Sequence, residues 1–233
     1  MMTIRQATVT DLPVVLDVLH EAQDWLRSRG CDQWPDGSPN FGPDRIGAQI
    51  GRGEFWIADD KDGPVATIAM SGEGDPDFWT EAERAESAVY LSKAAVVRRR
   101  AGEGVGALVL RWVSDKAARD GAKWLRLDAW RTNEALHQYY KRQGWAYLRT
   151  VNTPGRKSGA LFQRPAGGDP GARTALRELP PGPDWSHDVV EQDWEHDVGS
   201  PGGTYEHIQS PRATPRRKSS ALKATDCRTT VAS

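Results

Sequence analysis

Cysteine is scarce in this sequence, whose 233 residues contain only Cys31 and Cys227. Cys31 lies in a turn-rich segment and Cys227 lies close to the C-terminal end, so their spacing fits neither a disulfide framework nor a zinc site. We therefore expect two free thiols and no bound metal.

Long apolar runs and an excess of one charge are also missing. No segment approaches the roughly 18 apolar residues of a membrane span, and the N-terminal stretch MMTIRQATVTDL has no apolar signal core. The chain has 31 Lys and Arg against 32 Asp and Glu, a formal net charge of -1, whereas dedicated nucleic-acid or membrane-surface binders usually carry a large basic excess. These absences favour a cytoplasmic protein with no nucleic-acid or membrane partner.

The composition changes along the chain. Apolar periodicity is nearly continuous up to about Arg164, whereas the sequence from Pro165 onward is rich in Pro, Gly, Ser and charge. Scattered apolar residues in such a segment cannot offset the entropic cost of ordering it. We expect one folded domain over residues 1–165 and a disordered Pro/Gly-rich tail over 166–233. The repeated DWSHDV and DWEHDV at 184–189 and 193–198 are interpreted as low complexity.

Within the first 165 residues, the spacing of apolar residues predicts the helices and strands. Leu12, Val15, Leu19 and Leu26 share one helical face, and Gly30 ends that helix. We expect strands at 3–7, 54–59, 64–70, 88–97, 124–130, 145–150 and 159–164, and helices at about 10–30, 44–50, 105–121 and 133–143. The predicted order is β-α-α-β-β-β-α-β-α-β-β.

The segment at 94–113, AAVVRRRAGEGVGALVLRWV, joins a strand to a helix through three arginines and a glycine-spaced turn. This order suggests a cofactor that carries phosphate, because backbone N–H groups at a helix N-terminus bind anions. Gly102, Gly104 and Ala107 also satisfy G-x-G-x-x-G/A, with Asp128 at the acidic position of a dinucleotide fold. Because only one helix and two strands follow Asp128, an NAD(P)-binding oxidoreductase is the less favoured alternative.

The order of elements resembles that of the GNAT N-acetyltransferase superfamily, and two motifs carry the resemblance. The acyl-CoA signature of that family is a strand ending Leu-Ala-Val, followed by Gln/Arg-x-x-Gly-x-Gly/Ala at a helix N-terminus. The strand end matches at Ala94, Ala95 and Val96, and the glycines match at Gly104 and Gly106, whereas Ala101 replaces the polar residue. The second motif, Asn-x-x-Ala-x-x-x-Tyr-x-x-x-Gly-Phe, corresponds to Asn133, Leu136, Tyr140, Gly144 and Trp145.

The resemblance implies a mixed, mostly antiparallel α/β (α+β) sheet of about seven strands flanked by four helices and splayed between strands 4 and 5. It also implies acetyl-CoA as co-substrate. The residues expected to bind it are Ala94, Ala95, Val96, Gly102, Glu103, Gly104, Val105, Gly106, Ala107 and Asn133. Because Ala101 offers no polar side chain, backbone amides would do most of the anion binding. Arg98 to Arg100 either assist the phosphates or are solvated surface arginines.

The resemblance also assigns catalytic roles. Tyr140 is the candidate general acid, because a phenol stays protonated at neutral pH and can donate to a departing thiolate. Tyr139 competes for this role, although spacing from Asn133 favours Tyr140. Asp128 on the fifth strand is the candidate general base, with a structural role as the alternative.

Weaker candidates for the base and the features of an acceptor site complete the expectations. Glu86 and Ser92 are weaker alternatives to Asp128, and His137 is expected to be a partly exposed helix residue rather than a proton shuttle. Aromatic residues expected near the acceptor are Trp25, Trp34, Phe41, Trp56, Phe78, Trp79 and Tyr90, with Asp32, Glu81 or Glu86 as charges for a cationic amine.

We thus expect an acetyl-CoA-dependent N-acetyltransferase that acts, by direct attack in a ternary complex, on a primary amine of a small molecule or peptide. The alternative is a catalytically silent protein that binds acyl-CoA or interacts through its tail. Homodimers are common in the family, although no feature of this sequence establishes one.

Overall fold

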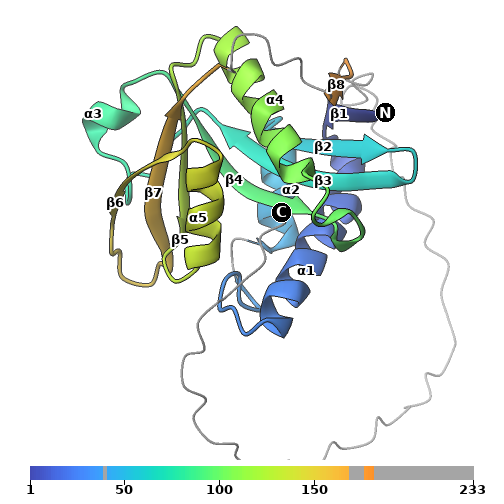
Figure 1. Ribbon diagram of the computed structural model, residues 1–233, viewed down its shortest axis with the longest axis horizontal. Helices are drawn as coiled ribbons and strands as arrows, with labels where there is room; N and C mark the ends of the chain where they lie inside the picture. The colour runs from blue at the N-terminus through green and yellow to red at the C-terminus, as the bar shows by residue number, and fades with distance from the viewer. Residues whose placement is uncertain (39–40, 168–175, 181–233) are drawn as a thin grey trace, which may run out of the picture. The chain divides into compact units, whose positions relative to one another are not determined.

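The computed structural model describes residues 1–38, 41–167 and 176–180, and its strands form a single sheet in the order β6-β7-β5-β4-β3-β2-β1-β8 (Figure 1). The strands are β1 (Met2–Gln6), β2 (Phe55–Asp60), β3 (Gly63–Ser71), β4 (Ala88–Val96), β5 (Trp124–Trp130), β6 (Ala146–Thr150), β7 (Ser158–Pro165) and β8 (Leu176–Glu178). Neighbours run antiparallel except β4 with β5 and β1 with β8. The expected mixed, mostly antiparallel sheet is confirmed, and a parallel dinucleotide-binding sheet is not formed.

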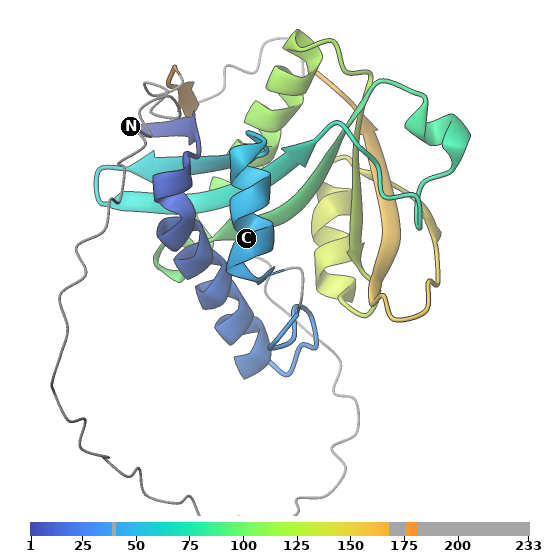
Figure 2. The same ribbon diagram turned by 180° about the vertical axis from the view of Figure 1, so that it is seen from behind.

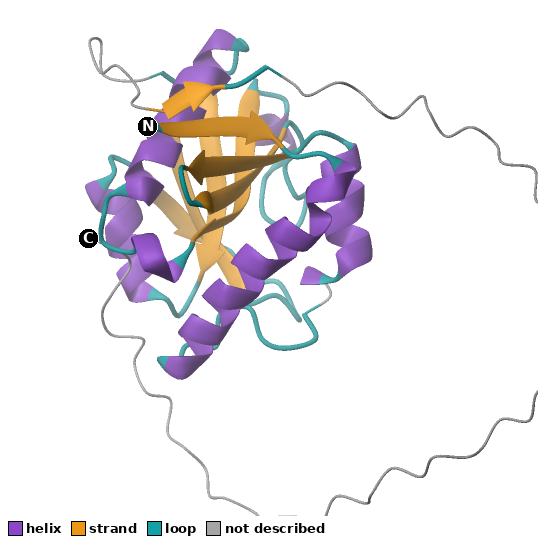
Figure 3. Cartoon of the chain, turned by 90° about the vertical axis from the view of Figure 1, so that its right-hand side faces the viewer, coloured by secondary structure: helices purple, strands orange, loops and turns teal. Residues whose placement is uncertain are grey.

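The four expected helices cover both faces of this sheet. They are α1 (Leu12–Ser28), α2 (Pro43–Gly51), α4 (Val105–Arg119) and α5 (Glu134–Arg142), and the single turn α3 (Glu81–Arg84) is added to them. Helices α4 and α5 lie on one face, in front in Figure 1, and α1 and α2 lie on the other, in front in Figure 2. Figure 3 shows the strands between these two helical layers. In the described part of the chain, no helix is long and apolar enough to cross a membrane.

The helices are held to the sheet by the apolar positions that the sequence spacing predicts. Val15 and Leu19 of α1 and Val109 and Val113 of α4 are all buried. They share one hydrophobic core with inward residues of the central strands, including Ile68 of β3. Each fully buried aliphatic side chain of this kind contributes about 1.5–3 kcal/mol of hydrophobic free energy, which fixes the layers that carry the site.

The structure departs from the predicted tail at β8, which the sequence analysis did not contain. Leu176 is 4% exposed, and β8 pairs in parallel with β1 from Met2↔Leu176 to Ile4↔Glu178. Glu178 also forms an ion pair with Arg119 of α4, at 2.6 Å. The prediction of a disordered tail from residue 166 onward is therefore wrong for residues 176–178. The rest of the predicted tail, the repeat at 184–198 and Cys227 included, lies outside the described residues.

Strands β4 and β5 separate half-way along their length. They pair from Ala88↔Trp124 to Leu91↔Leu127, and beyond this point the described strands have no ladder between them. On its other side, β4 has a bulge, because Ala69 opposes Ser92 while Thr67 opposes Ala95, which leaves two residues of β4 opposite Ile68. Lys93 in this bulge has a left-handed backbone with φ of 51°. The expected splay is confirmed, and it opens the sheet at its centre.

Candidate active site

The splay is bordered by two adjoining cavities. Cavity 1, of about 150 Å³, is lined mainly by apolar groups, among them Ala94–Val96 of β4, Gly106 and Val109 of α4, and Leu136 of α5. Cavity 2, of about 480 Å³, lies toward α2, the β3–β4 connection and the end of β5, and its lining includes charged groups of both signs. An apolar cavity beside a charged one can hold two different molecules next to each other.

The two cavities share one wall. The residues that line both are Gln33, Trp34, Ile68, Ala94, Leu110, Leu136 and Tyr140. A polar group in this shared wall can act on molecules in either cavity, and the phenol of Tyr140 is the ionisable one among them.

The residues expected to bind the cofactor fall into two groups. Ala94, Ala95, Val96, Gly106 and Asn133 line cavity 1. The remaining ones, Gly102, Glu103, Gly104, Val105 and Ala107, form the loop and first turn at the N-terminus of α4.

The glycines of this loop are required by its backbone. Gly102 and Gly104 have φ of 85° and 74°, a region in which side chains are strained, and Gly104 is the N-cap of α4. A Cβ on Gly106 would lie 2.8 Å from the Tyr139 hydroxyl oxygen, so glycine keeps this end of cavity 1 open. The helix begins with free backbone N–H groups where the motif expects an anion.

The three arginines before this loop have different partners. The guanidinium of Arg98 lies 4.1 Å from the centre of the Trp25 ring, and Arg98 lines cavity 1. Arg99 donates to Asp60, at 3.2 Å, and to carbonyl oxygens of the β2–β3 hairpin, while Arg100 lies 3.5 Å from Asp60 and 3.2 Å from Glu103. Of the three, Arg98 is thus the one whose side chain faces the cavity.

Asn133 caps α5 and is joined to a residue that sequence reasoning missed. Its Oδ1 accepts from the Leu136 N–H at 3.0 Å, and its Nδ2 donates to Gln33 Oε1 at 2.7 Å. Nearby, Asp32 accepts from Trp130 Nε1 and Thr132 Oγ1, which fixes the α1–α2 loop against the β5–α5 turn. No local pattern marks Gln33, because its partner is 100 residues away.

Tyr140 lies at the junction of the cavities in an aromatic environment. Its ring centre is 5.7 Å from those of Trp145 and Phe162, and burial raises the pKa of its phenol. Within the described residues, its hydroxyl has no hydrogen-bond partner. Tyr139 lines cavity 1 but not cavity 2, and burial raises its pKa to about 12.

Asp128 lies at the point where β4 and β5 separate. It follows Leu127, the last residue of β5 that pairs with β4, and it lines cavity 2. Burial raises the pKa of its carboxyl to about 6, although a hydrogen bond from Ser158 and the charge of Arg156 oppose the shift. Such a carboxylate is ionised at neutral pH and can accept a proton there.

The weaker base candidates are placed differently. The Glu86 carboxylate is occupied by Arg126 and Lys123 and does not line either cavity. Ser92 lines cavity 2. His137 is buried rather than partly exposed, because its Nε2 lies 2.8 Å from the Trp130 carbonyl and its ring contacts Phe162.

The aromatic residues expected at the acceptor site lie in different places in the structure. Trp34, Phe41, Trp79 and Tyr90 line cavity 2, and Trp25 lines cavity 1. Trp56 instead contacts Trp112 in the core, and Phe78 lies under the guanidinium of Arg156. The acids expected beside the acceptor do not line cavity 2, where the acidic residues are Glu54, Glu73, Asp75 and Asp128.

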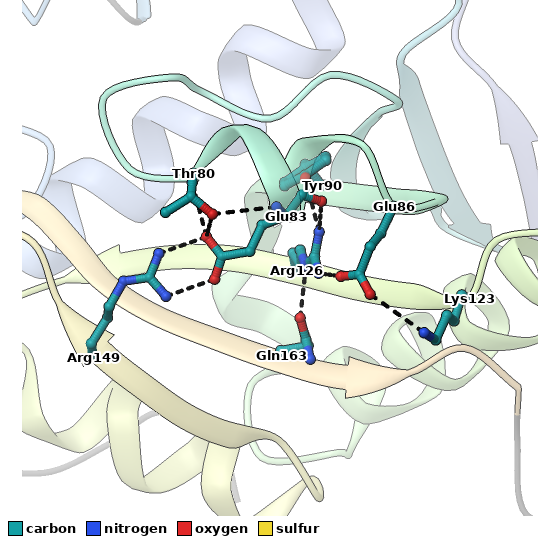
Figure 4. Close-up of polar contacts among 8 residues, drawn as sticks. All are labelled: Thr80, Glu83, Glu86, Tyr90, Lys123, Arg126, Arg149 and Gln163. Atoms are coloured by element: carbon teal, nitrogen blue, oxygen red, sulfur yellow. Dashed lines mark hydrogen bonds and ion pairs between the residues drawn. The ribbon is translucent and has the colours of Figure 1, made fainter.

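An ion network centred on the buried Arg126, drawn in Figure 4, holds the β3–β4 connection against the sheet. Arg126 of β5 is 1% exposed and donates to Gln163 Oε1 at 2.7 Å, to the Tyr90 hydroxyl at 3.2 Å and to Glu86. Sequence analysis missed it, because an arginine inside an apolar strand gives no sign of its partners.

A second arginine extends the same network to β6. Glu83 of α3 accepts two hydrogen bonds from Arg149 at 2.6 and 2.7 Å, which lower the pKa of its carboxyl to about 2. Its carboxylate also accepts from Thr80 in a capping box. The network fixes Trp79 and Tyr90, two walls of cavity 2.

Comparison with known proteins places this geometry in a family. The family model described as "Acetyltransferase (GNAT) domain" matches residues 51–147. The Bacillus subtilis (strain 168) protein named "Uncharacterized N-acetyltransferase YesJ" is 31% identical over 146 residues, which cover 61% of this chain and 80% of that protein.

Solved structures share the fold at lower identity. An acetyltransferase of the GNAT family from Listeria monocytogenes 4b F2365 superposes with a TM-score of 0.61 at 23% identity, over 70% of this chain and 94% of that one. The PaiA N-acetyltransferase of Thermoplasma acidophilum, solved with coenzyme A, gives 0.54 at 14% identity over 71% and 99%. The yncA protein of Salmonella typhimurium, solved with acetyl-CoA, gives 0.53 at 17% identity over 75% and 99%. This chain therefore belongs to the GNAT acetyltransferase family.

Proposed function

We propose that this acetyltransferase moves an acetyl group from acetyl-CoA to a primary amine of a small molecule or peptide by direct attack in a ternary complex. The observation that carries the proposal is the shared wall of the two cavities. Tyr140 lines both of them, and Asp128 lines cavity 2 at the start of the splay. A donor in cavity 1 and an acceptor in cavity 2 would meet at these two side chains.

Cavity 1 fits the donor. On the side of β4 that faces the splay, the backbone of residues 92–96 has no ladder partner among the described strands, so its polar groups are available to an extended arm. The N-terminus of α4, with Gly102 and Gly104 in the loop before it, suits a diphosphate, and Arg98 adds a positive charge. Bound acetyl-CoA supplies an activated thioester, and related structures solved with coenzyme A or acetyl-CoA support this assignment.

The chemistry follows from the protonation states of the two side chains. Asp128, ionised above pH 6, takes a proton from the ammonium group of the acceptor, directly or through water, and leaves a neutral amine. The amine nitrogen forms a bond to the thioester carbonyl carbon, the carbon–sulfur bond then breaks, and the nitrogen releases its second proton to solvent to leave a neutral amide. Tyr140, kept protonated by burial, donates a proton to the departing sulfur.

An amine panel tests this proposal on the full chain. We expect release of coenzyme A, corrected for hydrolysis, together with an acetylated product found by mass spectrometry for at least one primary amine. Initial rates measured against both substrates should give intersecting lines, because no acetyl-enzyme forms. Binding of coenzyme A without transfer to any amine or peptide would instead support the silent acyl-CoA-binding alternative.

A further inference from the structure

The charges that line cavity 2 do not all neutralise one another. Arg52 is paired with Glu54 at 2.6 Å, and Arg156 is paired with Asp75 at 2.6 Å. The charged groups of the lining that remain are the cations Arg45 and Lys93 and the anions Glu73 and Asp128. A cavity lined by uncompensated charges of both signs is complementary to a ligand that carries both signs.

The two cations come from different elements and face the same space. Arg45 belongs to the face of α2 that also turns Gln49 toward cavity 2, and Lys93 lies on the β4 bulge. Within the described residues, neither has a carboxylate at ion-pair distance. Burial lowers the pKa of the Lys93 ammonium to about 8, and repulsion from Arg45 adds to this shift, while the charges of Glu54 and Asp128 oppose it. A bound anion would relieve this repulsion.

The opposite charge lies where transfer has to occur. Asp128 lines cavity 2 together with Tyr140 of the shared wall, so the ammonium of an acceptor belongs at this end. Lys93 lies one residue beyond Ser92, at the mouth of the same splay, and its charge interacts with that of Asp128. Lys93 therefore lies near the position proposed for the reacting amine, and Arg45 lines the same cavity.

The backbone of Lys93 supports a functional reason for its position. A non-glycine residue with φ of 51° costs free energy, about 1 kcal/mol or more, which an asparagine or glycine would reduce. The bulge nevertheless turns a long cationic side chain toward cavity 2. Strain of this kind is kept where the side chain is needed.

We propose that the acceptor is a free amino acid, whose carboxylate is bound by Lys93 and Arg45 while its amine faces Asp128. This inference rests on the proposed function and adds the substrate class to it. Trp34, Phe41, Trp79 and Tyr90 supply the aromatic lining of the same cavity, so the side chain of the amino acid is apolar.

Matched acceptors test the carboxylate directly. For phenylalanine, leucine and methionine, we compare the L-amino acid, its amide and the corresponding amine without the carboxyl group, with the full chain and saturating acetyl-CoA. The expected kcat/KM of the best amino acid exceeds that of its amide and its amine at least tenfold, mainly through KM.

Charge-removing variants show whether the proposed residues are responsible. Lys93→Gln and Arg45→Gln should each lower the ratio of amino-acid to amine kcat/KM at least fivefold. Lys61→Gln removes the same charge from an exposed turn between β2 and β3, so its ratio should match the wild type. Coenzyme A binding, measured by calorimetry, shows that each variant is folded.

Two other outcomes would overturn the inference, and they separate it from the proposed function. Amides or amines that react as well as the amino acids would exclude a carboxylate site and leave the acetyltransferase proposal standing. If no compound is acetylated although coenzyme A binds, the proposed function fails. In that case, calorimetric titration of L-phenylalanine, L-leucine and L-methionine into the coenzyme A complex tests the carboxylate site independently of catalysis. If none of the three amino acids gives a heat of binding, the inference is overturned.

Discussion

At the residue scale, the position of Tyr140 gives the sharpest prediction about catalysis. Its phenol is buried, without a hydrogen-bond partner among the described residues, and lies in the wall shared by both cavities. Tyr140→Phe removes the proton donor and retains the ring packing against Trp145 and Phe162. We expect kcat to fall about 10²- to 10⁴-fold, as for loss of a general acid, with the affinity for coenzyme A unchanged.

Tyr139→Phe is the matched control, because Tyr139 is adjacent in sequence and lines cavity 1 alone. Its kcat should stay within about threefold of the wild type, since Tyr139 is not part of the wall shared with cavity 2, at which the thioester and the acceptor meet. Equal rates for Tyr140→Phe and the wild type would remove Tyr140 from the mechanism. A large loss in Tyr139→Phe alone would transfer the acid role to Tyr139.

The raised pKa of the Asp128 carboxyl leads to a prediction about the pH dependence of the reaction. Its carboxyl has a pKa of about 6, so the acidic limb of kcat/KM should rise through about pH 6 as the carboxylate forms. The groups around it are Ser158, which donates a hydrogen bond, and the charges of Arg156, Asp75 and Lys93. Asp128→Asn should lower kcat/KM about 10²-fold at pH 7.5 and abolish this limb.

Stability provides an independent measurement of the same pKa. The folded pKa of Asp128 is raised above the ordinary 3.8, so the folded state holds the proton more tightly than the unfolded state. Its contribution to the free energy of unfolding therefore falls as pH rises from about 4 to about 6. Asp128→Asn should remove this decline in denaturant titrations, while an unaltered decline would show that Asp128 titrates normally.

At the element scale, the start of α4 sets the shape of cavity 1. A Cβ on Gly106 would lie 2.8 Å from the Tyr139 hydroxyl, too close unless that side chain moves. Gly106→Ala should weaken coenzyme A binding about tenfold in calorimetry, because the crowded side chain is pushed into the cavity. We expect no comparable loss of stability, since alanine favours helix by up to about 1 kcal/mol over glycine.

Gly47→Ala is the control within a helix on the opposite face. A Cβ at Gly47 meets Leu12 Cδ2 at 3.7 Å, an ordinary contact, so this variant should bind coenzyme A as the wild type does. If Gly106→Ala also retained full affinity, cavity 1 would not be the site of the donor.

The network around Arg126 joins α3 to the sheet and shapes the acceptor side. Arg126→Met removes the buried guanidinium and leaves Gln163 Oε1 and the Tyr90 hydroxyl without their donor, and a buried polar group left unsatisfied costs about 1–3 kcal/mol. We expect a loss of about 2 kcal/mol and a higher KM for the acceptor, because Tyr90 loses its hydrogen bond. Affinity for coenzyme A should not change.

Lys123→Met tests the exposed end of the same network. Its ammonium lies 3.3 Å from Glu86 and is largely solvated, so stability should change by less than about 0.5 kcal/mol in denaturant titrations. A similar loss in both variants would mean that the network acts through surface charge and not through its buried arginine.

Several of these elements could be predicted from the sequence, because their signals are local. The periodic apolar residues of α1 and α4 and the glycines of the α4 loop specify helices and their ends within a few residues. The bulge at Lys93 could not be predicted, since it depends on the register between β3 and β4. The Gln33–Asn133 and Arg126–Glu86 contacts likewise join residues far apart in the chain, for which no short motif exists.

At the scale of the whole molecule, the boundary of the folded domain differs from the prediction. Three residues, Leu176–Glu178, are too few to show a strand period, so sequence analysis assigned them to the tail. Long-range contacts hold these three residues in place, namely the ladder with β1, burial of Leu176 and the ion pair of Glu178 with Arg119.

This boundary leads to a prediction about truncated chains. A chain that ends after residue 180 retains β8, including the hydrogen bond from the Leu179 N–H to the Ile4 carbonyl at 2.8 Å. A chain that ends after 167 loses it, exposes an edge of β1 and forfeits the burial of Leu176, worth about 1.5–3 kcal/mol. We expect the longer chain to unfold like the full chain and the shorter one to be less stable by about 2 kcal/mol.

Because β8 lies at the edge of the sheet next to β1, away from the splay, both truncated chains should bind coenzyme A in the folded state with the affinity of the full chain. Equal denaturation midpoints for the two truncated chains would show that β8 contributes nothing to stability, and loss of coenzyme A affinity in the longer one would place residues beyond 180 in the donor site.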